Sequence, residues 1–547
     1  MEEISRPREE MRSLLRSFMA ERERTFLFLH SQLSNLQQSL CQIRPSCPSK
    51  IRAFLSYRFP INRVLDILPG LTTLLALFIY PLLQYGPSKV FYAQVFQILF
   101  ITFWIGYLIV NMAKGLRTRR EIVANMDIDW SDHISQTGRE PDLYLILMPL
   151  KKETNRHVLF QTLLSIQKQR YPKDKMTVFP IIEEEDQETI DRVMRILPGF
   201  KGKLDIRVFT YPAREIPNPC KATSVSMIGR WLSQREDLGE FRADHTKILV
   251  IDADTILHPQ DLAFREYSHR IESIKDLQLG RKGSILQSLT TYTSNYWKVP
   301  MLPRLHNTGF VLYQMGRMQG RSDYLILGPG TSIPFSIFEA VSYFEPNRHN
   351  EDMQFRYKVI MEGFRVVPLR IPTWGQAPLT TRESWGQIAR WARGAADVKF
   401  IVNYRRMLPQ CGFSLAACKP FLALRALLAN STPPIMVLLP TELILMSWVF
   451  PNFDRFGLTA FLYAYQTVVF TLSMIIGMVF VPHLLKPILY VPQPKRWKMM
   501  RRLFEWFRLV FTPMNIHNYY LMAFAQLYTQ TRMALGLSIS HTEVTRK

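Results

Sequence analysis

Two long apolar segments near the start of the chain constrain its fold more than any other feature. Residues 64–85 and 90–112 consist mostly of apolar side chains and carry very few charges. About 20 apolar residues in a helix are enough to cross a bilayer. Two later segments, 432–450 and 457–481, have a similar character, although the first contains three prolines and Glu442. The sequence therefore predicts four transmembrane helices, and buried helices of a soluble core are the alternative.

The distribution of basic residues predicts the orientation of these helices. The loops inside the two pairs carry only Lys89 and Arg455, whereas Lys and Arg gather outside each pair. Because cytoplasmic flanks are enriched in Lys and Arg, we expect a multi-pass membrane protein. Both termini and the region between the pairs are expected to lie in the cytoplasm.

The net charge narrows the class of partner. Lys and Arg total 68 against 45 Asp and Glu, which gives +23. Such an excess favours an anionic partner, such as nucleic acid, lipid headgroups or a phosphate-bearing substrate. The apolar segments favour the lipid bilayer and the phosphate-bearing substrate, and no nucleic acid is expected. The five cysteines form no C-x-x-C pair, which indicates reduced thiols rather than a disulfide framework or a zinc site.

The region between the membrane pairs alternates between strand and helix patterns. Residues 143–150, 176–182, 205–211 and 247–251 are apolar runs typical of strands, and residues 155–169 are typical of a helix between the first two. This alternation predicts an open, mostly parallel α/β sheet. In such sheets, ligands bind at the carboxyl ends of the strands.

Acidic residues follow two of these strands. Glu183, Glu184 and the next two acids follow the second strand, and Asp252 and Asp254 follow the fourth. Side chains two apart on an extended chain point to the same side, so Asp252 and Asp254 are expected to converge if the strand geometry continues past Ile251. Two carboxylates suit Mg²⁺ or Mn²⁺ together with the phosphates of a substrate. The alternative for both groups is a solvated loop.

A third group of acids opens a predicted helix. The stretch 349–364 is expected to form a helix that begins after Asn350, an N-cap residue, and stops at Gly363. Glu351 and Asp352 then occupy its first turn. The helix dipole favours their ionised forms, so Asp352 is a candidate proton acceptor. The alternative is that both acids only stabilise the helix.

A further cluster combines an amide, a guanidinium and an indole. In a helix over residues 384–395, Gln387, Arg390 and Trp391 share one face. An arginine fork binds phosphate oxygens, and an aromatic plane packs on the apolar face of a sugar. An ordinary surface helix is the alternative.

The order of these motifs resembles a known family. IDADT (251–255), NEDMQ (350–354) and QIARW (387–391), with SIQKQRYP (165–172) before them, are similar to the motifs of the membrane-integrated family 2 glycosyltransferases. That group contains the cellulose and hyaluronan synthases. The resemblance implies a cytoplasmic α/β domain of the GT-A type inserted between transmembrane helices. It also implies inverting sugar transfer from a nucleoside-diphosphate donor, favouring UDP-sugars, in polysaccharide synthesis of the β-glycan type.

The resemblance also assigns roles to residues on the donor side. Glu183 or Glu184 would bind the nucleoside, and Asp252 would meet the nucleotide. Asp254, together with Asp252, would hold Mg²⁺ or Mn²⁺. The residues implied to bind the diphosphate are Lys221 and Arg390.

On the acceptor side, the resemblance implies that Asp352 is the general base, with Glu351 beside it. GPGTS (328–332) is similar to the loop that lines the acceptor site in the family. The residues implied to bind a glycan or lipid-linked acceptor are Gln387, Trp391, Gly330 and Thr331.

Two departures from the family keep other functions open. Fewer spans follow the catalytic region than in polymer-extruding members, and residues 502–538 suggest interfacial helices. Transfer of a single sugar to a lipid or short glycan therefore remains an alternative. A phosphatase of the haloacid dehalogenase type, with Asp252 as nucleophile, and a non-catalytic membrane scaffold are more remote alternatives.

The predicted organisation has six parts. They are an N-terminal cytoplasmic helical and basic region (1–63), two transmembrane helices (64–112), the GT-A domain (113–400), interfacial helices (401–431), two transmembrane helices (432–482) and a basic interfacial C-terminal region (483–547).

Overall fold

The computed structural model describes most of the region between the predicted membrane pairs and a few segments on either side. The described residues are 68, 71–75, 87–152, 155–214, 216, 219–234, 243–319, 324–345, 351–395, 398–403, 423–424, 426–427, 460–461, 464–465, 468, 485–490 and 524–532. By contacts the chain divides into Met1–Val64 and Leu65–Lys547, and all described residues belong to the second unit.

Most of the predicted membrane spans lie outside the described residues. This is so for 432–450 and for most of 64–85 and 457–481, whereas 90–112 lies within one long helix, α5 (Pro87–Asp127). In the described part of the chain, no helix combines the length and the apolar character needed to cross a membrane. Helix α5 also continues through the predicted domain boundary at residue 113.

A nine-stranded mixed sheet forms the centre of the fold, with the order β3-β2-β1-β5-β8-β7-β9-β6 and β4 also paired with β2. The strands are β1 (Leu143–Leu150), β2 (Met176–Glu183), β3 (Asp205–Ile206), β4 (Phe209–Tyr211), β5 (Thr246–Val250), β6 (Ile256–Leu257), β7 (Ser284–Thr291), β8 (Thr331–Pro334) and β9 (Arg365–Trp374). Strand β1 pairs in parallel with both β2 and β5, as the sequence predicts. The other half of the sheet departs from the prediction, because β8 runs antiparallel to both β5 and β7.

The predicted strand 205–211 is wrong as a single element. It consists of β3 and β4, which pair with β2 on either side of a short break at Arg207 and Val208. At the break, the backbone N–H of Arg207 still donates to Val178 O at 2.9 Å.

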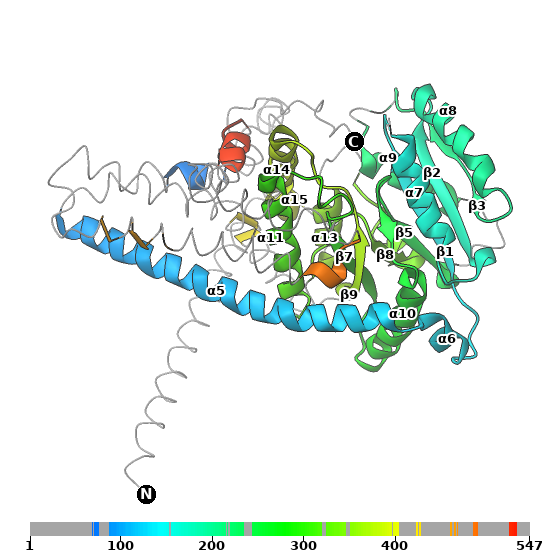
Figure 1. Cartoon of the computed structure of the whole chain (residues 1–547), viewed down its shortest axis with the longest axis horizontal. Coiled ribbons are helices and arrows are strands. Elements are labelled where there is room, and N and C mark those ends of the chain that lie inside the picture. The colour runs from blue at the N-terminus through cyan, green and yellow to red at the C-terminus, as the bar shows by residue number, and fades with distance from the viewer. Residues whose placement is uncertain are drawn as a thin grey trace, which may run out of the picture. The chain divides into compact units, whose positions relative to one another are not determined.

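Helices cover both faces of the sheet (Figure 1). Besides α5, the α-helices are α6 (Trp130–Ser135), α7 (Arg156–Gln167), α8 (Gln187–Ile196), α9 (Lys221–Ser233), α10 (Asp261–Gln278), α11 (Met301–Arg317), α12 (Phe335–Ala340), α13 (Glu351–Met361), α14 (Thr381–Ala395) and α15 (Val398–Asn403). Local signals explain several boundaries. The Asn155 side chain caps α7 by accepting from the backbone of His157, and Gly363 ends the α13 turn with a φ of +86°.

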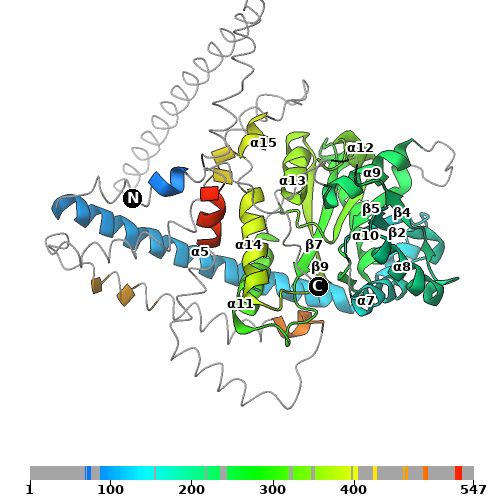
Figure 2. The same ribbon diagram turned by 90° about the horizontal axis from the view of Figure 1, so that it is seen from above.

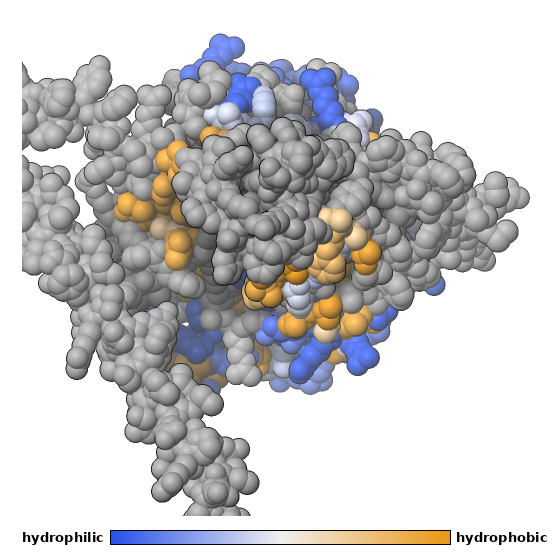
Figure 3. All heavy atoms as spheres, turned by 90° about the vertical axis from the view of Figure 1, so that its left-hand side faces the viewer, coloured by the Kyte–Doolittle hydropathy of each residue, from blue (hydrophilic) through white to orange (hydrophobic). Residues whose placement is uncertain are grey.

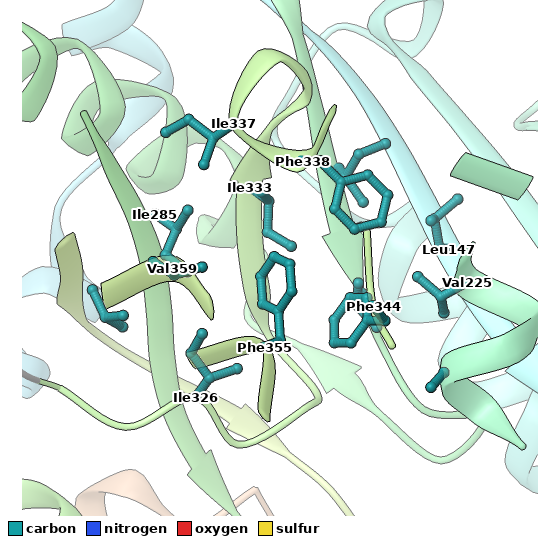
Figure 4. Packing of buried hydrophobic residues seen from close by; sticks show 14 of the residues in the cluster. Leu147, Val225, Ile285, Ile326, Ile333, Ile337, Phe338, Phe344, Phe355 and Val359 are labelled. Atoms are coloured by element: carbon teal, nitrogen blue, oxygen red, sulfur yellow. The ribbon is translucent and has the colours of Figure 1, made fainter. Parts of the chain in front are cut away.

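Strand β1 shows why the sheet is buried on both sides. Leu145 and Leu147 pack into one core with α9, α12 and α13, whereas Tyr144, Ile146 and Met148 pack into a second core with α6, α7, α8 and α10. Successive side chains of a strand point to opposite faces, so a continuous apolar run fits a strand buried on both sides. Figure 4 shows the first core, in which Phe355 of α13 lies beside Phe344 and Ile333.

Helix α5 is fixed to the domain through its second half, where it packs against α11 (Figures 1 and 2). A Cβ at Gly316 would lie 2.8 Å from Asn111 O, so only glycine permits this contact. The Thr118 hydroxyl donates to Met315 O at 2.8 Å, and the Arg370 guanidinium of β9 pairs with Glu121 at 2.7 Å.

Exposed apolar side chains mark the middle of α5, from residue 99 to residue 110. Leu99, Phe103, Ile109 and Val110 are each at least half exposed. Figure 3 shows patches of hydrophobic residues on the face of the molecule that lies to the left in Figure 1.

Candidate active site

The two acids after β5 lie on a turn and not on a continuing strand. Strand β5 ends at Val250, and the Thr255 N–H donates to Asp252 O at 3.0 Å. The Thr255 hydroxyl in turn accepts from the Asp252 N–H at 2.9 Å. The predicted extended geometry past Ile251 is therefore wrong, and a reverse turn places the two carboxylates instead.

Asp252 forms an ion pair with Lys221, the first residue of α9. Although burial lowers the pKa of Lys221, the negative charges of Asp252 and Glu351 raise it above its ordinary value. Lys221 is therefore a permanently charged ammonium that connects the turn after β5 with the start of α13.

Asp254 is almost fully buried, with 3% of its surface exposed. Its Oδ2 accepts a hydrogen bond from the backbone N–H of Gln376, which follows β9, at 3.0 Å. This carboxylate therefore also fixes the loop after β9.

Glu351 and Asp352 open α13 as predicted, although Asn350 lies outside the described residues. Burial and the neighbouring Asp352 charge raise the pKa of Glu351 to about 8. Burial also raises the pKa of Asp352, to about 6, against the opposing effects of the Met353 N–H and of Lys221. The expectation that the helix dipole dominates is thus reversed by desolvation, but Asp352 remains mostly ionised at pH 7.

Lys221, Asp252, Glu351 and Asp352 form a charged centre, and the GPGTS segment (328–332) borders it at Gly328. A Cβ at Gly328 would lie 3.3 Å from Lys221 Nζ and 3.8 Å from Asp352 Oδ2. Gly330 and Thr331 are also buried, but Gly330 lies against Ser288 and Thr373, and Thr331 already belongs to β8.

The acidic run after β2 divides into different roles. Glu183 is half-buried and pairs with Lys151 at 2.7 Å, whereas Glu184 is exposed. Glu185 accepts from the backbone of Ala213 and Arg214, and Asp186 caps α8. Glu183 is the last residue of β2 and therefore the acid of this run that lies at the strand end itself.

Helix α14 carries Gln387, Arg390 and Trp391, as the spacing predicts. The Trp391 ring stacks on Phe310 of α11 at 4.9 Å and lies 5.7 Å from the His306 ring. Gln387 is 8% exposed, and its buried Oε1 accepts no hydrogen bond from the residues that the structure describes. A buried acceptor of this kind is costly unless a ligand or water satisfies it.

Tyr292, directly after β7, lies between the acids and the aromatic residues, and no sequence motif predicts it. Its ring lies 6.0 Å from that of Trp391, and Gly375 lies against its edge. Burial raises the pKa of Tyr292, and the charges of Asp252, Asp352 and Asp254 raise it further, while Arg390 lowers it. Four charged groups from three parts of the chain therefore lie around this one phenol.

The two acids after β5 fit a divalent cation only together with a substrate. Among the described residues, no three His, Cys, Asp or Glu side chains gather as a metal site. Mg²⁺ is commonly held by one or two carboxylates plus phosphate oxygens, and Asp252 and Asp254 supply that number near Tyr292.

The comparison with known families agrees with this geometry. Residues 247–481 match the model for glycosyl transferase family group 2. The matched region is less than half of the 547 residues; it starts in β5 and includes the turn with Asp252 and Asp254, the start of α13, and α14.

One relative with a curated name also matches. The probable glycosyltransferase YdaM of Bacillus subtilis (strain 168) is 26% identical over 275 residues, which cover 48% of this chain and 58% of the relative. The chain thus spans less than two thirds of that relative's length.

Solved structures show only weak similarity. The mannosyltransferase PcManGT from Pyrobaculum calidifontis, in complex with GDP-Man and Mn²⁺, is 14% identical, with 69% of this chain and 97% of that chain covered and a TM-score of 0.42. TarS 1–349 of S. aureus, in complex with UDP-GlcNAc, is 13% identical, with 74% and 95% covered and a TM-score of 0.29. Similarity at this level assigns no substrate.

Proposed function

We propose that the chain is a family 2 glycosyltransferase of the GT-A type, which transfers a sugar from a nucleoside-diphosphate donor to a hydroxyl acceptor with inversion. The observation that carries the proposal is the cluster of Lys221, Asp252, Glu351 and Asp352 against the Gly328 backbone. The cluster combines a cation for a diphosphate with a carboxylate that can accept a proton. The family match over residues 247–481 supports the same chemistry.

The donor side would be formed by residues at the carboxyl ends of β2 and β5. Glu183, with Glu184 beside it, would bind the nucleoside, and Asp252 would meet the nucleotide, with a UDP-sugar favoured. As the bond to the diphosphate breaks, negative charge grows on the leaving group. Lys221 and Arg390 are the cations that would stabilise it.

Asp352 would act as the general base. The acceptor oxygen forms its bond to the anomeric carbon while the bond from that carbon to the diphosphate oxygen breaks, and the acceptor proton passes to the Asp352 carboxylate. A single displacement of this kind inverts the anomeric configuration. Glu351, whose raised pKa keeps it largely protonated at pH 7, leaves Asp352 as the ionised acid of the pair.

Asp252 and Asp254 would hold Mg²⁺ or Mn²⁺ together with the donor phosphates. Bound there, the cation would supply charge neutralisation for the leaving diphosphate. The hydrogen bond from Gln376 keeps the Asp254 carboxylate in place near the donor side.

Residues of α14 and the GPGTS segment would face the acceptor. Trp391 would pack against a sugar ring, and the buried Oε1 of Gln387 would accept from an acceptor hydroxyl. Gly330 and Thr331 would act from behind the loop, because both are buried. Repeated transfer that builds a β-glycan is the favoured outcome, and a single transfer to a lipid or short glycan is the alternative.

The chain would act as a multi-pass membrane protein with its catalytic domain and both termini in the cytoplasm. The support comes from the hydropathy of 64–85, 90–112, 432–450 and 457–481 and from the distribution of basic residues. The apolar side chains that are exposed on α5 between residues 99 and 110 are consistent with a lipid environment.

The test is release of nucleoside diphosphate by the full chain purified in detergent. UDP- and GDP-sugars are screened with Mg²⁺ or Mn²⁺, with and without membrane lipid extract as acceptor. The Asp352→Asn variant should lose about 10²–10⁴-fold in rate, the usual contribution of a general base. The Asp205→Asn variant, which makes the same change at an exposed surface carboxylate, should retain full activity.

No release with any donor would overturn the proposal. A phosphate covalently bound at Asp252 after incubation with phosphorylated substrates would support a phosphatase instead. Product length then distinguishes repeated from single transfer.

A further inference from the structure

The segment before β8 turns sharply beside the charged centre. Gly328 and Gly330 have φ values of +76° and +80°, a region that glycine enters readily. Glycine on both sides of Pro329 also makes other orientations of the intervening peptide planes accessible at low cost. The conformation of this loop therefore depends on the contacts that hold it.

Every carbonyl from Gly328 to Gly330 is bonded to a group of the domain itself. The donors are Thr331 Oγ1 to Gly328 O at 2.9 Å, Gln287 Nε2 and Thr290 Oγ1 to Pro329 O at 3.0 Å each, and Arg265 Nη1 and Ser288 N to Gly330 O at 2.9 and 3.1 Å. These oxygens are therefore committed to the sheet and α10. The loop offers its Gly328 Cα, and no carbonyl oxygen, to Lys221 and Asp352.

Gln287 is the central member of this network. It is fully buried on β7, and its amide nitrogen donates to Pro329 O. Its Oε1 accepts from Leu327 N at 3.1 Å and lies 2.6 Å from Thr331 Oγ1, whose single proton it shares with Gly328 O. One side chain thus binds the loop before, within and after the turn.

Arg265 is a buried, charged residue that also binds the loop. Its side chain is fully buried on α10, and Asp261, one turn before it, neutralises it through two hydrogen bonds of 2.6 and 3.1 Å. The remaining nitrogen donates to Gly330 O. A buried ion pair contributes little net stability, so its clear effect here is to orient that carbonyl.

We propose that Gln287 and Arg265 are positioning residues for the active site, which keep the loop carbonyls turned away from Lys221 and Asp352. The inference rests on the proposed function. A carbonyl oxygen that rotated toward this centre would accept from the Lys221 ammonium and compete with the diphosphate of a donor. It would also repel the phosphate oxygens directly.

The test compares Gln287→Leu with Gln169→Leu. Gln169 is equally buried and donates to Ser165 O and His258 O, but it does not contact the loop. Both variants are expected to lower the melting temperature similarly. Hydrogen exchange over residues 324–334 should become faster in Gln287→Leu alone, because three hydrogen bonds to the loop are lost. Calorimetry with Mn²⁺ should show binding of UDP or GDP weakened about tenfold.

Two further variants keep the inference testable if Gln287→Leu does not fold. Thr290→Val removes the second donor to Pro329 O without changing the shape of the side chain, and Arg265→Lys keeps the charge but alters the donor to Gly330 O. Each should reproduce the faster exchange and the weaker binding to a smaller degree.

Unchanged exchange over residues 324–334 in these variants would overturn the inference, as would an equal loss of nucleotide binding in Gln169→Leu. If the wild-type protein binds neither UDP nor GDP, the proposed function fails. Faster exchange in the loop variants would then still support the positioning of the loop, and only its link to a nucleotide would be lost.

Discussion

The buried carboxylate of Asp254 accepts a hydrogen bond from the backbone N–H of Gln376 at 3.0 Å. Asp254 lies on the turn after β5, and Gln376 follows β9, three places away in the sheet order. One carboxylate thus joins two loops at the same edge of the sheet. The same residue is proposed to hold a metal, so its structural and chemical roles can be separated.

The variants Asp254→Asn and Asp254→Ala separate the structural role of Asp254 from its proposed role as a metal ligand. Asparagine keeps an oxygen that can accept from Gln376 but loses the negative charge, whereas alanine loses both. We expect the free energy of unfolding to change little in the first variant and to fall by about 1–3 kcal/mol in the second. Both should weaken Mn²⁺-dependent UDP or GDP binding by calorimetry at least about tenfold. Wild-type metal dependence in Asp254→Asn would leave Asp254 with a structural role only.

The rate of transfer should depend on pH through Asp352. Burial raises the pKa of this acid to about 6, and the base works only when ionised. Activity should therefore be constant above pH 7 and fall about tenfold per unit below pH 6. Lys221 lowers this pKa, so Lys221→Met should move the midpoint to higher pH, while Lys151→Met should leave it unchanged. A pH–rate profile with no break near pH 6 would argue against Asp352 as the base.

Gly328→Ala tests how closely the loop borders the charged centre. The new Cβ would lie 3.3 Å from Lys221 Nζ at a φ of +76°. Gly202→Ala is a matched control, because its φ is +73° and nothing lies within 4 Å of the new Cβ. Both variants should lose about 1–2 kcal/mol of stability from backbone strain. Only Gly328→Ala should lose activity, by about tenfold or more, and equal activity in the two variants would contradict the prediction.

The aromatic group around Trp391 should affect the acceptor more than the donor. Phe310→Leu removes the ring stacked at 4.9 Å on Trp391 while keeping most of the apolar volume. We expect a change in tryptophan fluorescence. The KM for the acceptor should rise several-fold, because an aromatic pair contributes about 1 kcal/mol. The affinity for nucleoside diphosphate should stay within about twofold. A selective loss of nucleotide affinity would place the Trp391 side with the donor instead.

Local signals in the sequence were sufficient for the parallel half of the sheet. The apolar runs of β1, β2 and β5 and the helical pattern over 155–169 predict the elements at nearly their observed bounds. Asn350 and Gly363 predict helix α13, and the pattern over 384–395 predicts α14 with Gln387, Arg390 and Trp391. These elements are specified mainly by residues within or next to them.

The other half of the sheet could not be predicted in the same way. Strand β7 reads SILQSLTT, and all eight of its residues are buried although five of them are polar. Gln287 and Thr290 are satisfied by the loop before β8, which is about 40 residues away in sequence. Tyr292 was missed for a related reason, because its neighbours come from separate segments and no local pattern joins them.

Helix α5 has a mechanical consequence for the site. Its 41 residues extend about 60 Å, and its second half is held against α11 where Gly316 meets Asn111. Helix α11 in turn presents His306 and Phe310 to the Trp391 ring. A displacement of the Pro87 end of α5 would therefore reach the aromatic residues around Trp391 through α11.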